Sequence, residues 1–153
     1  MAILDFYKEQ EDVFNKIGES TLAALATSSE NFPTVRTMSI IIHEKVIYFQ
    51  TGIDLMKYRQ ISMNKNVALS INNIQIEGTA NIMGKPVEHE EIMTIYKKYF
   101  KNSYEKYSKL EKEVLIKVIP RKITIWEYDF NGKPYRIFIE FENKKAYKEF
   151  YGD

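Results

Sequence analysis

The sequence predicts a mainly β protein with α additions, in the form of an antiparallel β-barrel of six or seven strands with peripheral helices. Short runs of β-branched and aromatic residues recur along the chain and indicate strands. Several of these runs are joined by two-residue turns, which make neighbouring strands antiparallel. Helical spacing is confined to a few insertions, so the regular strand–helix alternation of a parallel α/β sheet is missing.

The composition favours a single globular domain over residues 1–153. Hydrophobic residues make up 44% of the chain and aromatic residues 14%, which supports a packed core and argues against disorder. A formal net charge of +1 argues against a protein built to bind nucleic acid or an anionic membrane. No apolar run approaches membrane-spanning length, and the first residues lack the apolar core of a signal peptide.

The chain contains no cysteine. This excludes disulfides, thiolate metal sites and a cysteinyl–flavin bond. It also suits a reducing compartment, so we expect a cytoplasmic protein.

The first predicted elements are a helix and a strand. Asp5 is a candidate N-cap for a helix that runs to about Ile17 and stops at Gly18. We expect this helix to cover one end of the barrel. Residues 21–27 form a strand of small residues, and residues 28–33 have the composition of a turn.

The rest of the chain is organised around residues 33–69. Residues 33–43 and 46–52 are predicted strands, and the Glu44-Lys45 pair between them is short enough for a hairpin turn. After Gly52 the spacing becomes helical, and two faces are expected, one with Leu55, Tyr58 and Ile61 and the other with Lys57 and Gln60. A helix that follows a strand through a glycine turn presents free N–H groups, so a lysine in its first turn marks a candidate anion site.

The second half of the chain alternates between strands, turns and polar helical segments. The expected order is a strand over 67–71, a turn at Asn72-Asn73, a strand over 74–83, a polar helical stretch over 88–117, a strand over 119–128, a hairpin turn at Asn131-Gly132, a strand over 135–141 and a helical tail over 144–151. The tail would dock on the barrel or on a partner chain. Lysines and tyrosines in the 88–117 stretch are interspersed with acids, so we interpret it as a solvated amphipathic helix rather than an RNA-binding one.

An ordered set of motifs resembles the FMN-binding split barrel of the pyridoxamine 5'-phosphate oxidase superfamily. The set lies within about 100 residues, from Leu25 to Trp126, and consists of Pro33-x-Val35-Arg36-x-Met38, Tyr48-Phe49-x-Thr51, Lys57-x-x-Gln60-Ile61, Asn66-Val67-Ala68-Leu69, Glu77-Gly78-x-Ala80 and Ile123-x-Ile125-Trp126. The resemblance implies a split β-barrel, an FMN cofactor and a homodimer with flavin at the interface.

FMN requires a cationic cradle for its phosphate, and two residues are candidates. From the residues alone, Arg36 is either an exposed arginine on a half-buried strand or a phosphate ligand, and Lys57 is either a surface lysine or a phosphate ligand. The resemblance implies phosphate contact for both. Met56 stands where the family often has a second arginine or lysine, which makes Lys57 more important or phosphate binding weaker.

The resemblance also implies contacts with the rest of the flavin. The expected contacts come from two strands, through Arg36, Thr37, Met38 and Ser39 and then Gln50 and Thr51. Either Asn73 or Gln75 falls near a family amide that reaches the flavin ring, although an ordinary turn residue is the stronger interpretation of Asn73. Trp126 and Arg136 match a pair that approaches the flavin from the second subunit, and core packing is the alternative for Trp126.

Two departures from the family pattern argue against oxidation of vitamin B6. The family enzyme has a lysine where this chain has Ile41, and an arginine-x-histidine motif where this chain has Gly132-Lys-Pro134. We therefore expect an FMN-dependent oxidoreductase that transfers hydride or electrons between a donor such as a reduced nicotinamide and an unknown small molecule.

Two other classes of function remain as alternatives. One is a non-catalytic flavin- or haem-binding protein for storage, sensing or stress, with His43 or His89 as a haem ligand. The other is an interaction module without a ligand. No metal site is expected, because the acids around His89 are explained by a helix start.

Overall fold

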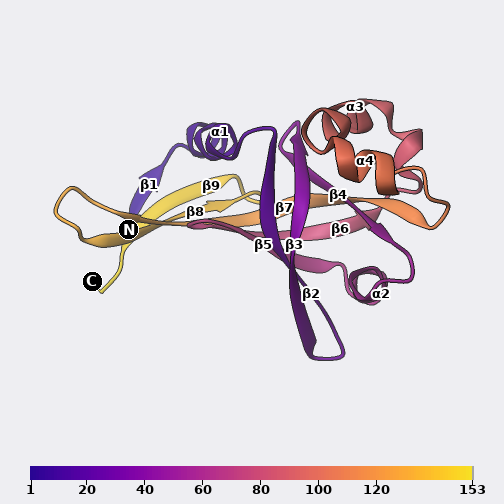
Figure 1. Cartoon of the computed structure of the whole chain (residues 1–153). Helices are drawn as coiled ribbons and strands as arrows, with labels where there is room; N and C mark the ends of the chain where they lie inside the picture. Colours follow the sequence, from indigo (N-terminus) through magenta and orange to yellow (C-terminus); the bar gives the residue numbers. More distant parts are fainter. Residues whose placement is uncertain (153) are drawn as a thin grey trace.

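The computed structural model describes residues 1–152, which form nine strands in one antiparallel sheet and four α-helices (Figure 1). Asp153, the last residue of the predicted domain, lies outside the described residues. The strands are β1 (Ala2–Leu4), β2 (Ser20–Ser29), β3 (Phe32–His43), β4 (Val46–Gly52), β5 (Asn66–Ile71), β6 (Ile74–Ile82), β7 (Glu113–Tyr128), β8 (Pro134–Glu140) and β9 (Lys145–Phe150). The helices are α1 (Phe6–Ile17), α2 (Met56–Met63), α3 (Glu90–Tyr99) and α4 (Lys101–Tyr107), with a short 3₁₀ turn, η1 (Pro86–Glu88), before α3.

Six of the strands close into a barrel, which confirms the predicted antiparallel barrel with peripheral helices. They follow the order β7-β4-β3-β2-β5-β6, and pairing between β6 and β7 closes the ring. The remaining strands extend the sheet on the other side of β7, in the order β8-β9-β1. In Figure 1 this extension projects to the left of the barrel, beneath α1.

Strand β7 connects the barrel to the extension because it is 16 residues long. Its first part pairs with β4, its last part pairs with β8, and its middle pairs with β6. The β6–β7 register shifts between Glu77 and Gly78, opposite Pro120, whose missing N–H is tolerated at such an irregularity. A Cβ atom at Gly78 would lie 2.6 Å from a Val118 methyl carbon, so the close approach of the two strands requires glycine.

Local signals for turns and caps are confirmed. Asp5 accepts a hydrogen bond from the Lys8 backbone N–H, and Gly18 ends α1 with a positive φ of 83°. Both residues of the Glu44-Lys45 turn have positive φ, as a tight two-residue hairpin needs. Asn72 and Gly132 likewise adopt positive φ in their turns.

The core divides into a main cluster inside the barrel and a smaller cluster outside it. Apolar residues of α1 join the main cluster, and α1 also packs against β8 and β9. The smaller cluster lies between α3 and the outer face of the barrel and consists of Ile41, Ile92, Met93, Tyr96 and Leu115. In Figure 1, α3 and α4 lie over the end of the barrel that is remote from the extension.

One predicted helical segment is wrong, and a second is helical only in part. The tail over 144–151 is not a helix, because residues 145–150 form β9, which pairs with both β8 and the unpredicted strand β1. The stretch over 88–117 contains two shorter helices that break at Phe100, and its last residues belong to β7, which begins at Glu113. In both segments, pairing with distant strands overrides the local helical spacing.

Within residues 1–152, every helix is too short or too polar to cross a bilayer.

Candidate functional site

A cavity of about 670 Å³ opens where strands β3 and β4 separate. These strands pair over only three residue pairs, Ile41–Tyr48, Ile42–Ile47 and His43–Val46, and then diverge. Helix α2 and the segment from α3 to the start of β7 complete the walls. The lining residues are Thr37, Met38, Ser39, Gln50, Thr51, Gly52, Asp54, Leu55, Lys57, Tyr96, Ser103, Tyr107, Leu110, Glu111, Lys112 and Glu113.

Six of the predicted cofactor-binding residues line this cavity. Thr37, Met38 and Ser39 come from β3, Gln50 and Thr51 from β4, and Lys57 from the first turn of α2. Because β4 has left β3 at this point, the backbone of residues 37–39 has no strand partner on the cavity side. Free backbone groups of this kind are available to a ligand.

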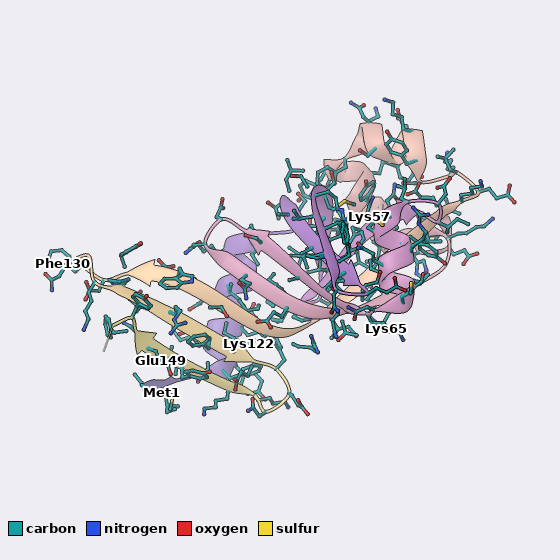
Figure 2. All side chains as sticks on the ribbon, turned by 90° about the horizontal axis from the view of Figure 1, so that it is seen from below. Met1, Lys57, Lys65, Lys122, Phe130 and Glu149 are labelled. Carbon is teal, nitrogen blue, oxygen red and sulfur yellow. The ribbon has the colours of Figure 1, made fainter. Side chains whose placement is uncertain are left out.

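Lys57 is a half-buried cation that lines the cavity. Figure 2 labels its position on the barrel. Burial lowers the pKa of its ammonium group, the nearby charge of Arg36 lowers that pKa further, and Glu113 opposes the shift. Lys57 makes no ion pair or side-chain hydrogen bond with the described residues. An anion in the cavity would therefore supply the charge compensation that the ammonium group lacks.

Arg36 does not line the cavity, although its charge acts on Lys57. Its guanidinium donates to the Thr27 hydroxyl at 2.7 Å, to the Leu25 carbonyl at 3.3 Å and to the Thr34 hydroxyl. These acceptors are all neutral, and burial lowers the pKa of Arg36. Arg36 is thus held in place while its charge is left without a carboxylate partner among the described residues.

Gln60 orients Arg36 indirectly, through two threonines. The sequence predicted a polar helix face for Gln60, and this prediction is wrong. The Gln60 side chain, on α2, is only 2% exposed. Its Oε1 accepts hydrogen bonds from Thr27 at 2.5 Å and Thr34 at 2.6 Å, and its Nε2 donates to the Phe32 carbonyl at 2.9 Å. The two threonine hydroxyls therefore connect Gln60 to Arg36.

Gln50 lines the cavity and carries an unsatisfied buried donor. Its side chain is 7% exposed, and its Oε1 accepts a hydrogen bond of 2.8 Å from the buried Ser108 hydroxyl. Its Nε2 is buried and has no partner among the described residues. Leaving a buried donor unpaired costs roughly 1–3 kcal/mol, so a ligand that accepts this hydrogen bond would gain affinity.

Glu113 is a site residue that sequence reasoning missed. It was included in the helical stretch over 88–117, whereas it begins β7 directly opposite Gly52 of β4. It is 7% exposed, and burial raises the pKa of its carboxyl group. Tyr96, on the polar stretch as well, is buried at the same cavity, and burial raises the pKa of its phenol group. The β-branched run after Glu113 was the signal that could have located it on a strand.

The other predicted cofactor-binding residues lie outside the cavity. Asn73 donates to the Trp126 carbonyl at 2.6 Å, and the Trp126 ring lies 5.5 Å from the Arg136 guanidinium. Gln75 is exposed on β6 and donates to Glu77 at 3.4 Å. Figure 2 places Lys57 on the barrel and Phe130, at the tip of the β7–β8 hairpin beyond Trp126, at the far end of the molecule.

Both histidines also lie outside the cavity and have protein partners. His43 Nε2 is 3.1 Å from a Glu91 carboxylate oxygen, and His89 Nε2 is 2.7 Å from the Met83 carbonyl oxygen. Across residues 1–152, the acidic and histidine side chains form no group that could hold a metal ion.

The cavity residues fit the flavin that the sequence resemblance implies. Lys57 provides a cation without an ion-pair partner in residues 1–152, the separated strand provides free backbone groups, and Gln50 provides an unpaired donor. The phosphate of FMN is complementary to the cation, its ribityl chain to the free backbone groups, and the carbonyl oxygens at its ring edge to the unpaired donor.

Comparison with known families finds one matching family. The sequence profile of the family described as pyridoxamine 5'-phosphate oxidase matches residues 8–127, which is most of the chain. That range includes all the residues that line the cavity and the barrel strands, except for Tyr128, the last residue of β7. A search of curated proteins finds no match.

Solved structures of similar fold come from proteins with different names. General stress protein 26 from Bacillus anthracis is 22% identical, and the match covers 88% of this chain and 98% of that chain with a TM-score of 0.60. PhzG from Burkholderia lata, in complex with tetrahydrophenazine-1-carboxylic acid, is 13% identical, with 94% and 87% covered and a TM-score of 0.61. HutZ, the haem storage protein from Vibrio cholerae, is 13% identical, with 78% and 91% covered and a TM-score of 0.58. At these identities the likeness shows the fold alone.

Proposed function

The chain belongs to the pyridoxamine 5'-phosphate oxidase family, and we propose that within this family it is an FMN-binding oxidoreductase that transfers hydride or electrons to or from a small molecule. The observation that carries this proposal is the opening between β3 and β4, where six residues predicted to contact flavin surround one cavity. Bound FMN would supply the redox chemistry, and the protein would supply binding and orientation.

The residues of the cavity have distinct roles in this proposal. Lys57 binds the phosphate directly, and Arg36 adds a second positive charge nearby, held by its threonine partners. The unpaired backbone of residues 37–39 and the Nε2 group of Gln50 donate to the polar groups of the ligand. Tyr96 and Leu110, on the α3–β7 side, cover the cavity and limit the access of water.

We also propose that the protein is a homodimer with flavin at the interface. In one chain, Trp126 and Arg136 do not line the cavity, so a second copy is needed if they are to contact the same ligand. The outer face of β2 and β3 beside the cavity carries two exposed apolar side chains, with Leu22 60% exposed and Val35 67% exposed. Exposed apolar side chains of this kind are suited to contact with another copy.

The absorption spectrum of the purified protein tests the proposal and its alternatives. We expect flavin bands in the near-ultraviolet and blue, or, for protein purified without cofactor, quenching of FMN fluorescence that saturates at about one FMN per chain at micromolar concentration. No quenching would refute FMN binding. A Soret band would instead identify a haem-binding protein.

Two further measurements test catalysis and assembly. Steady-state oxidation of NADH or NADPH would distinguish an enzyme from a flavin-storage protein. Light scattering should give the mass of a dimer with flavin bound, and a monomer mass would contradict the shared site.

A further inference from the structure

Glu113 places a carboxyl group in the part of the cavity where Lys57 offers its charge. It faces the cavity from the first position of β7, and it lies close enough to Lys57 that each group affects the pKa of the other. The described residues give its carboxyl group no hydrogen bond and no ion pair. Glu113 is therefore a poorly solvated acid beside a proposed phosphate site.

The surroundings of Glu113 favour its neutral form. Burial is the main cause of its raised pKa, the negative charge of Asp54 adds to the effect, and the positive charge of Lys57 opposes it. The other titratable or charged groups around the cavity are Tyr96 on α3, Tyr107 on α4, and Glu111 and Lys112 in the loop before β7. Lys112 and Glu111 are exposed, so solvent screens their charges.

We propose that Glu113 couples ligand binding to a proton: a phosphate-bearing ligand binds tightly in this cavity only when the Glu113 carboxyl group is neutral. The inference rests on the proposed function, because it takes the phosphate of FMN to bind at Lys57. A phosphate dianion would add like charge next to a carboxyl group that solvent reaches poorly.

The direction of the pH dependence follows from linkage. Bound phosphate raises the pKa of Glu113 above its value in the free protein, so the complex holds a proton more strongly than the free protein does. Ligand affinity therefore falls as pH rises from the pKa of Glu113 in the free protein towards its pKa in the complex. A ligand without the phosphate lacks this dependence.

The test compares FMN with riboflavin, which is the same ring and ribityl chain without the phosphate. Fluorescence titrations of wild type and Glu113→Gln are carried out across the pH range in which both proteins stay folded. Glu113→Gln keeps the shape of the side chain and removes its charge. Glu105→Gln, on the exposed part of α4 and outside the cavity lining, is the control.

We expect the FMN affinity of Glu113→Gln relative to wild type to increase with pH and to reach about tenfold, the effect of one pKa unit. The same ratio for riboflavin should stay near unity, and Glu105→Gln should follow wild type for both ligands. An FMN ratio that does not change with pH would overturn the inference. If neither ligand binds any of the proteins, the proposed function itself is wrong.

A second measurement decides the matter if Glu113→Gln fails to fold. Loss of the second phosphate proton, with a pKa of about 6, by itself strengthens the attraction of the ligand to Lys57 as pH rises. A fall in the FMN affinity of wild type relative to its riboflavin affinity as pH rises therefore reports the proton linkage. A ratio that falls nowhere across the pH series would refute it.

Discussion

Replacing Lys57 with alanine should weaken FMN binding without weakening the fold. Lys57 lies in the first turn of α2, where its positive charge opposes the helix dipole, and its side chain is half-buried. The lowered pKa shows that the folded state disfavours its charged form. At any pH where the ammonium group is protonated in both the folded and the unfolded state, the charge therefore reduces stability, and Lys57→Ala removes that penalty.

The effect on binding has the opposite sign and a larger size. A charge-assisted hydrogen bond to phosphate contributes roughly 1.5–3 kcal/mol, which corresponds to an increase in Kd of about ten- to a hundredfold. Fluorescence titration measures the FMN affinity, and thermal melting without flavin measures the stability. Riboflavin affinity should change much less, because riboflavin lacks the phosphate.

Lys101→Ala is the matched control for this substitution. Lys101 is also in the first turn of a helix, α4, but it is exposed and does not line the cavity. Equal FMN affinities of Lys57→Ala and Lys101→Ala would show that Lys57 is an ordinary surface lysine. A sharp fall in the melting temperature of Lys57→Ala alone would show that its role is structural.

Three further predictions follow from the fold and the cavity. Gln60→Ala should leave its buried hydrogen-bond partners unpaired and lower the free energy of unfolding by about 2–4 kcal/mol, or the melting temperature by about 5–15 °C. Gln75→Ala, on the exposed part of β6, should leave the melting temperature unchanged. Equal melting temperatures of the two variants would refute the role of Gln60. Gly78→Ala should destabilise the protein by roughly 1–3 kcal/mol, because the new Cβ would overlap β7, and an unchanged unfolding midpoint in urea would contradict this. Pyridoxamine phosphate should be a poor substrate, because Ile41 is fully buried in the cluster under α3 and offers no charge, and efficient hydrogen peroxide production would overturn that expectation.

Features set by neighbouring residues could be predicted from the sequence. The cap at Asp5, the stop at Gly18 and the turn at Glu44-Lys45 each depend on the conformational preferences of a few adjacent residues. The position of Lys57 in the first turn of a helix could also be predicted from adjacent residues, because a glycine turn and helical spacing precede and surround it. Local signals therefore identified one side of the cavity.

Features set by distant pairing could not be predicted in this way. Ala2 of β1 pairs with Lys148 of β9 although the two residues lie at opposite ends of the sequence. The helical spacing of aromatic residues in the tail led to the prediction of a helix where β9 lies. Glu113 faces the cavity only because of its register with β4, and Gln60 is buried only because two threonines of the β2–β3 hairpin approach it. Strand register and long-range contacts are not encoded by local periodicity.

A crystal structure of the protein with FMN tests the central claim, that the opening between β3 and β4 holds a flavin phosphate at Lys57. We expect the phosphate within hydrogen-bond distance of the Lys57 ammonium group, with the ligand running past the backbone of residues 37–39 and accepting from Gln50 Nε2. The account would be contradicted by FMN bound elsewhere on the molecule, or by a flavin in the cavity whose phosphate points away from Lys57 and into solvent.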